Sequence, residues 1–171
     1  EDVDGGEVEL VLLETFAGAK LIIGGGEGDR HTVETKAQAD HSLPYMLAAA
    51  LVDREMGNAQ YDPERISRDD VQYLLRHVTV EERDDFTERF EAGEMPARVT
   101  VELEDGTTYT VEKDAFAGHP TRPMGWDEIE RKFRDTAARL DDERRDDVVD
   151  VVRNLEAHDV ADLVGLLAEP P

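Results

Sequence analysis

The chain has 171 residues, enough for one ordinary domain, and its 39% of hydrophobic residues can form a core. Its 42 acidic residues outnumber 19 basic residues and give a formal net charge of −23, which argues against binding to nucleic acids or to anionic membranes. The absence of cysteine excludes disulfides, thiolate metal sites and cysteine nucleophiles, and no apolar stretch is long enough to span a membrane.

The acidic residues run through the whole chain, and only four of the basic residues are lysine. This composition is typical of proteins that fold in a salt-saturated cytoplasm, where salt screens the repulsion between carboxylates. We therefore expect a protein adapted to high salt, with an ordinary acidic protein as the alternative. No export signal opens the chain, so a cytoplasmic location is expected, and a first residue of Glu1 in place of Met fits a processed chain or a fragment.

Residues 7–16 alternate as a β-strand does, with Val8, Leu10 and Leu12 predicted on one face. The glycines at positions 24, 25, 26 and 28 then predict a flexible loop. This loop is not a phosphate-binding loop, because no Lys-Ser or Lys-Thr pair follows at the required spacing.

Two helices are predicted next. The first begins at Ser42, a favourable N-cap, with Pro44 in its first turn, where the backbone donors lack partners anyway. Its predicted apolar stripe consists of Leu43, Met46, Leu47, Ala50 and Leu51. The second helix begins at Ser67, and its predicted buried face consists of Val71, Leu74, Leu75 and Val78.

Residues 97–114 give the clearest local signal. Apolar and polar residues alternate on both sides of Asp105-Gly106, which predicts a β-hairpin with a tight turn. A helix is predicted from Asp127, with Glu130 completing a capping box, and its inward residues are expected to be Ile129, Phe133 and Leu140.

The last long helix is predicted over residues 142–158, and a short helical tail follows. The long helix is expected to bury Val148, Val151, Val152 and Leu155, and the tail carries Leu163, Val164 and Leu167. The order of all these elements predicts the α+β class, with a small antiparallel sheet that contains the hairpin and packs against several helices.

Residues 39–51 read ADHSLPYMLAAAL, which resembles a signature of the MmgE/PrpD family, the 2-methylcitrate dehydratase group. Further blocks follow in the family's order: PARV at 96–99, LEDGT at 103–107, GHP at 118–120 and Lys-Phe at 132–133. There are two departures. Lys36-Ala37-Gln38 replaces the usual Arg-Glu-Thr, which keeps a cation but loses bidentate geometry, and Asp53-Arg54 replaces Asp-Gly.

The resemblance implies that residues 1–140 are the small C-terminal domain of a two-domain lyase. Residues 141–171 would pack on that domain or on the family's helical domain, present in cis or in trans. The implied reaction dehydrates 2-methylcitrate to 2-methyl-cis-aconitate in propionate catabolism, with no metal and no cofactor; sibling enzymes decarboxylate cis-aconitate or epimerise an amino-dicarboxylate. A homodimer is also implied. Such reactions on small tricarboxylates need an acid, a base and cations that hold carboxylates.

His41 is the predicted catalytic residue, as a proton carrier or a hydrogen-bond donor, and a histidine tied to Asp40 or the backbone is the open alternative. Lys36, Ser42 and Tyr45 are the predicted substrate contacts. Lys36 would hold a carboxylate, or else is an exposed solubilising residue. Ser42 is favoured as an N-cap over a nucleophile, and Tyr45 either closes the cleft or packs in the core.

No metal site is expected, because the histidines lack ligand spacing and the acidic runs lack the glycine of a calcium loop. Most acid–base groups of the family lie outside this chain, so an incomplete active site is expected. A non-catalytic binding or interaction module with the same fold is the alternative function. If the helical domain docks here, an apolar face should remain exposed, with Val and Leu residues of the last helix as candidates.

Overall fold

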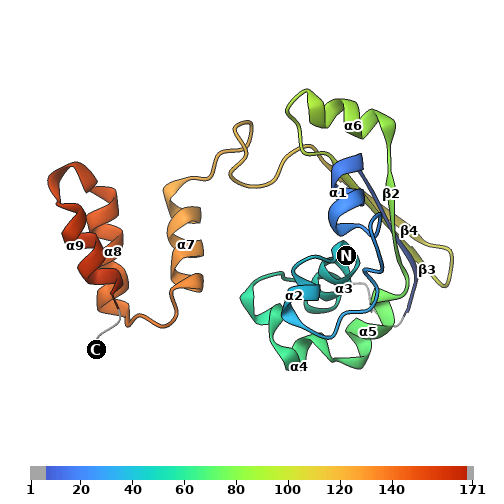
Figure 1. The fold of residues 1–171 in the computed structure, drawn as a ribbon, viewed down its shortest axis with the longest axis horizontal. Coiled ribbons are helices and arrows are strands. Elements are labelled where there is room, and N and C mark those ends of the chain that lie inside the picture. Colours follow the sequence, from blue (N-terminus) through green and yellow to red (C-terminus); the bar gives the residue numbers. More distant parts are fainter. Residues whose placement is uncertain (1–6, 169–171) are drawn as a thin grey trace. The chain divides into compact units, whose positions relative to one another are not determined.

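The computed structural model describes residues 7–168 and divides them into two compact units, which separate between Phe116 and Ala117 (Figure 1). The first unit holds the sheet and the second is helical. The predicted α+β class is confirmed. The domain limit expected after residue 140 stays a prediction.

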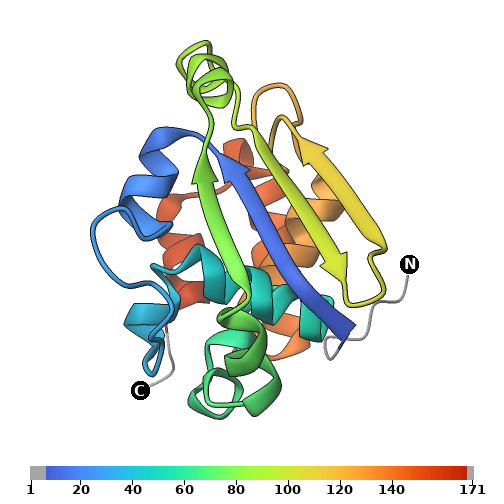
Figure 2. The same cartoon turned by 90° about the vertical axis from the view of Figure 1, so that its right-hand side faces the viewer.

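Four strands form the sheet of the first unit in the order β2-β1-β3-β4. They are β1 (Val8–Thr15), β2 (Val78–Glu82), β3 (Ala97–Leu103) and β4 (Thr108–Lys113). Figure 2 shows β1 and β2 running in the same direction, with β3 opposed to them. The sheet is therefore mixed and not wholly antiparallel as expected, because a series of helices carries the chain from β1 back to the start of β2.

The buried face of β1 differs from the predicted one. Val8 is buried, but Val11 and Leu13 continue the core face, whereas Leu10 is exposed. The register of β1 against β3 shifts between Val8 and Leu10, and this irregularity moves the alternation by one residue. The predicted face of Val8, Leu10 and Leu12 was therefore wrong beyond its first residue.

Helix α3 (Leu43–Asp53) begins where predicted. The hydroxyl of Ser42 accepts a hydrogen bond from the amide of Tyr45 at 3.0 Å, which satisfies an unpaired donor of the first turn. Its fully buried residues, however, are Pro44, Tyr45, Ala48 and Ala49, and the predicted stripe lies at the edge of the core. The face of the helix that points into the core is therefore the one with Tyr45, Ala48 and Ala49, and not the predicted stripe.

Helix α5 (Asp69–Leu75) buries Val71, Leu74 and Leu75 as predicted. Val78 is also buried, but it opens β2, because the helix ends at Leu75 and the chain becomes extended. The predicted helical assignment of Val78 was wrong. Both assignments bury the same side chain, so a short apolar pattern alone does not separate them.

The predicted hairpin is confirmed. β3 and β4 pair antiparallel, and Gly106 in the turn has a φ of 82°, which only glycine adopts freely. The remaining elements of this unit are α1 (Ala17–Ile23), α2 (Lys36–Ala39), η2 (Asn58–Tyr61), α4 (Pro63–Ile66) and α6 (Asp84–Glu91). Figures 1 and 2 show helices α1 to α5 gathered on one face of the sheet.

The glycine cluster packs against the end of α1 and is not a free loop. The amides of Gly24 and Gly26 donate to the Lys20 carbonyl, at 3.2 and 3.0 Å, and so satisfy the last turn. A Cβ atom on Gly24 would lie 2.8 Å from the Cα of Lys20, and one on Gly26 would lie 2.7 Å from the Cα of Leu21. Glycine is required at both positions because the backbone turns back onto the helix.

The second unit consists of α7 (Trp126–Thr136), α8 (Asp142–Arg153), η3 (Leu155–Ala157) and α9 (Val160–Leu167). The N-terminal cap of α7 lies two residues before the predicted one: the Glu128 carboxylate accepts from the Gly125 amide at 3.0 Å. Phe133 and Leu140 are half-buried, while Ile129 is exposed.

Helix α8 buries only part of its predicted apolar set. Val148 and Val151 are buried as expected, but Val152 and Leu155 are exposed. In α9, Val160, Val164 and Leu167 are all exposed. The second unit therefore leaves more apolar surface uncovered than the sequence pattern predicts.

Candidate functional site

The four residues predicted to form the site fall into an exposed pair and a buried pair. Lys36 and His41 are exposed, and they lie at the beginning and just beyond the end of the short helix α2. Thr35 begins this helix with a reciprocal cap, in which Gln38 accepts from the Thr35 amide at 3.0 Å. The cap fixes the turn that presents both side chains.

The ammonium group of Lys36 is held only weakly. Its Nζ atom lies 3.4 Å from a carboxylate oxygen of Asp40 and 4.6 Å from the ring centre of Tyr61, and the side chain is 64% exposed. An exposed pair of this kind contributes little because water competes for both charges. A carboxylate ligand could therefore replace Asp40 at little cost.

The histidine ring is oriented by the backbone. Nδ1 of His41 lies 3.1 Å from the carbonyl oxygen of Ala37, and because a carbonyl only accepts, Nδ1 carries the proton. In the neutral ring Nε2 is then an acceptor, and it has no hydrogen-bond partner among residues 7–168. This geometry leaves a nitrogen that can take up or return a proton.

Ser42 is occupied by structural hydrogen bonds. Its hydroxyl donates to the carbonyl of Arg30 at 2.6 Å while it accepts from the amide of Tyr45, and the residue is fully buried. The N-cap prediction is confirmed. A contact between Ser42 and a substrate stays a prediction, and the hydrogen bond to Arg30 ties the preceding loop to α3.

Tyr45 lies inside the core with its hydroxyl donating to the carbonyl of Gln60. Burial raises the pKa of Tyr45 to about 12, and the nearby Tyr61 and Asp53 add to the shift. A neutral, buried hydroxyl with a satisfied partner favours the packing role that the sequence left open. The predicted substrate contact of Tyr45 remains untested.

Asp53 anchors the other end of α3. Its buried carboxylate accepts from Gln60 at 3.0 Å, from Arg65 at 3.2 Å and from Arg68 at 2.7 Å. Burial opposes ionisation, but these hydrogen bonds and charges outweigh it and hold the pKa of Asp53 below its usual value. Arg54 follows with a φ of 58°, in the left-handed region, at the position where glycine usually stands in the resembling family.

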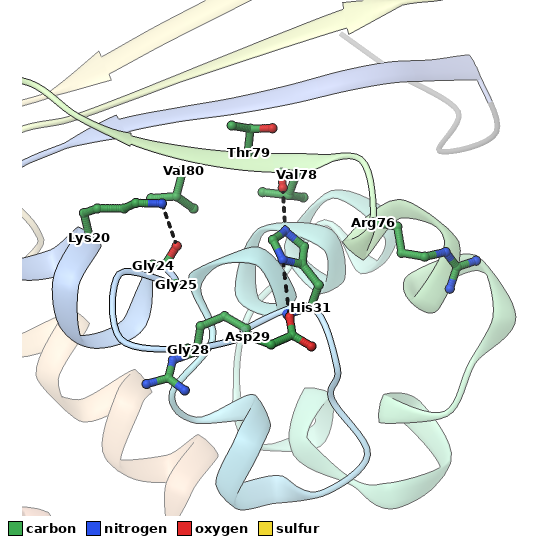
Figure 3. A pocket seen from close by; sticks show the side chains of 11 residues that line it. Lys20, Gly24, Gly25, Gly28, Asp29, His31, Arg76, Val78, Thr79 and Val80 are labelled. Atoms are coloured by element: carbon green, nitrogen blue, oxygen red, sulfur yellow. Dashed lines mark hydrogen bonds and ion pairs between the residues drawn. The ribbon is translucent and has the colours of Figure 1, made fainter.

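A second concave site lies in the first unit, between α1, the glycine loop and β2 (Figure 3). It has a volume of about 600 Å³. Its charged and polar lining consists of Lys20, Asp29, Arg30, His31, Arg76 and Thr79. Figure 3 shows Lys20 and His31 facing the same space, with Arg76 directed outward beyond His31.

Backbone contacts orient the pocket histidine. Nε2 of His31 lies 2.8 Å from the carbonyl of Val78 and so donates to it, while Nδ1 lies 3.7 Å from the Asp29 carboxylate. Hydrogen bonds from Thr32 and from the His31 amide lower the pKa of Asp29, which favours its charged form. Asp29 is the one acidic residue among those that line the pocket.

The described residues contain no cluster of three His, Asp or Glu side chains placed to hold a metal ion. None of their helices has both the length and the apolar character of a membrane span.

Residues 2–157 match the MmgE/PrpD C-terminal domain. This chain belongs to the MmgE/PrpD family. The resemblance seen in the ADHSLPY segment is therefore confirmed over most of the chain.

Two relatives of this chain are named cis-aconitate decarboxylase. The mouse (Mus musculus) protein is 29% identical over 139 residues, which is 80% of this chain, and the human (Homo sapiens) protein is 31% identical over 135 residues, or 78% of it. In each case the match covers 28% of the relative's length. The chain thus corresponds to a little over a quarter of each relative.

The cationic pocket was missed in the sequence. Its lining comes from three separate segments, around residues 20, 30 and 78, so no local motif marks it. Two signals were available: lysine is scarce in this chain, and Lys20 stands four residues before Gly24, the first residue of the glycine cluster.

Proposed function

We propose that this chain is the small domain of a lyase that acts on small tricarboxylates, with Lys36 and His41 facing the substrate. The observation that carries the proposal is their shared exposure on one capped turn: His41 lies in the family's signature segment, and Lys36 lies three residues before that segment begins. A cation and a proton-transfer group on the same turn are what a carboxylate substrate requires.

In this proposal Lys36 exchanges Asp40 for a substrate carboxylate. His41 holds its orientation through the Ala37 carbonyl and moves a proton at Nε2. For a dehydration, a base removes a proton next to a carboxylate and an acid protonates the departing hydroxyl. The partner group for His41 would come from the family's helical domain, in cis or in trans.

Dehydration of 2-methylcitrate, as in propionate catabolism, is the first candidate reaction, and decarboxylation of cis-aconitate is the second. The second is favoured by the names of the two relatives. In a decarboxylation the C–C bond to the departing carboxylate breaks, CO₂ leaves, and the carbon that keeps the electron pair takes a proton. His41 Nε2 could deliver that proton once the ring is protonated.

The apolar stripe of α9 is proposed to contact the helical domain. Val160 is 71% exposed and Val164 58% exposed, and with Leu167 they follow helical spacing on one side of α9. Apolar surface of this kind is commonly covered by another domain or subunit. A homodimer, a cytoplasmic location and adaptation to high salt belong to the same proposal, the last resting on the net charge of −23.

The test follows 2-methylcitrate dehydration and cis-aconitate decarboxylation in molar KCl. It compares this chain alone with the full-length product of its gene. Activity is expected only in the longer protein. In that protein His41→Gln should lower kcat by about 10²-fold or more, as loss of an acid–base group does, while Lys36→Gln should mainly raise KM.

His77→Gln is the matched control, because Nδ1 of His77 contacts the carbonyl four residues earlier at 2.9 Å, as His41 does. Equal kcat values for His41→Gln and His77→Gln would remove His41 from the reaction. Absence of both activities in the folded full-length protein would favour the non-catalytic module.

A further inference from the structure

The pocket between α1, the glycine loop and β2 has a charge opposite to that of the protein. Carboxylates outnumber basic residues by 42 to 19 in the chain, yet the pocket is lined by Lys20, Arg30, Arg76 and His31 against the single carboxylate of Asp29. Positive charge gathered in a concave site of a strongly negative protein creates a local field that attracts anions.

The three permanent cations of this pocket are not neutralised by the protein. Over residues 7–168, none of them forms an ion pair with a carboxylate, although eight other arginines do. Lys20 donates to the carbonyl of Gly24 at 3.3 Å, and Arg30 donates to the carbonyl of Ile22 at 2.8 Å. These neutral acceptors leave the charges available to a ligand.

The donors of this pocket are also incompletely used. The Nε atom of Arg30 is buried and has no acceptor in the described part of the chain. Because that atom has almost no accessible surface, a ligand in the pocket would meet the terminal nitrogens of the guanidinium, one of which donates to Ile22, and an oxyanion is the ligand that such a group binds best. Three ordered features hold the site in place: the glycine loop on α1, the Ser42 bond to Arg30, and the His31 bond to Val78.

We propose that this pocket binds a small multivalent oxyanion, with Lys20 and Arg30 as its main cationic contacts. The volume of about 600 Å³ admits a ligand of citrate size. The pocket lining does not include Lys36 or His41. The proposal therefore goes beyond the lyase assignment and holds or fails independently of it.

The test uses the whole 171-residue chain and measures binding by calorimetry, with citrate and inorganic phosphate as separate probes. Binding of citrate identifies a carboxylate site, and binding of phosphate alone identifies a phosphate site; either supports the proposal. Lys20→Gln and Arg30→Gln should each weaken binding about tenfold, the loss expected for one charge-assisted hydrogen bond. Rising KCl should also weaken it.

Two controls keep the test decisive. Lys113→Gln makes the same charge change on an exposed residue of β4 and should alter affinity less than about twofold. His41→Gln should leave binding unchanged, which separates this site from the proposed catalytic residue. Circular dichroism verifies the folding of each variant. If Arg30→Gln unfolds, Lys20→Gln still tests the proposal, because it removes one part-buried hydrogen bond to the carbonyl of Gly24.

Amide chemical shifts locate the ligand. The signals of Gly24, Gly25 and Gly28, which line the pocket, should move on addition of the bound probe. Binding of neither anion at low salt, or affinities unchanged in Lys20→Gln, or shift changes confined to other parts of the chain would overturn the proposal.

Discussion

Tyr45→Phe removes one hydroxyl from the centre of the first unit. The aromatic ring of residue 45 keeps its packing, but the buried carbonyl of Gln60 loses its hydrogen-bond donor. A buried carbonyl without a partner costs about 1–3 kcal/mol. We therefore expect the variant to unfold at lower urea concentration than the parent protein at neutral pH.

The same hydroxyl makes a distinct prediction at alkaline pH. Burial raises the pKa of Tyr45 to about 12 in the folded protein, above the value of about 10 for an unfolded chain. The folded state therefore holds this proton more tightly, and its stability is full below pH 10 and falls as the pH rises toward 12. A shift of this size corresponds to roughly 2–3 kcal/mol.

One experiment measures both the effect of the lost hydroxyl and its dependence on pH. Urea unfolding, followed by circular dichroism at constant KCl, gives the free energy of unfolding of both proteins at pH 8, 10 and 11.5. The deficit of Tyr45→Phe should shrink above pH 10, because only the parent loses the tyrosine contribution. A deficit that stays constant over the whole range would show that Tyr45 is not buried as described, and would revive its predicted place in a substrate cleft.

Four further substitutions test the local geometry by urea unfolding. Gly24→Ala should destabilise by about 1–3 kcal/mol, because its Cβ would meet Lys20 and Val80, whereas Gly18→Ala in α1 has room and should stabilise by about 0.5–1 kcal/mol. Arg54→Gly should stabilise by about 1 kcal/mol, since glycine adopts the left-handed conformation without strain. Asp53→Asn should flatten the loss of stability below pH 4, because the lowered pKa of Asp53 makes its contribution full above the unfolded pKa and lost as the pH falls.

Each of these has a clear contrary result. Equal effects of the two alanine substitutions would contradict the close packing of the glycine loop on α1. A destabilised Arg54→Gly variant would mean that the contacts of the Arg54 side chain outweigh its backbone strain. An unchanged acid profile in Asp53→Asn would contradict the buried network at the end of α3.

Features that depend on neighbouring residues were predictable from the sequence. Ser42 caps α3 because its hydroxyl needs only an amide three residues ahead, and Asp105-Gly106 turns the hairpin because glycine tolerates a positive φ. The ADHSLPY segment likewise identified the family, which the match over residues 2–157 confirmed. These features depend on a few consecutive residues, so they can be predicted without knowledge of the tertiary structure.

Features that depend on distant residues were decided only by the tertiary structure. The core face of β1 follows from its irregular register against β3, and the burial of Tyr45 follows from packing against Gln60, fifteen residues away. The cationic pocket joins Lys20, His31 and Arg76 through the parallel pairing of β1 with β2. Apolar periodicity carries no information on which strands pair, because many pairings bury the same side chains, and only the complete fold selects one of them.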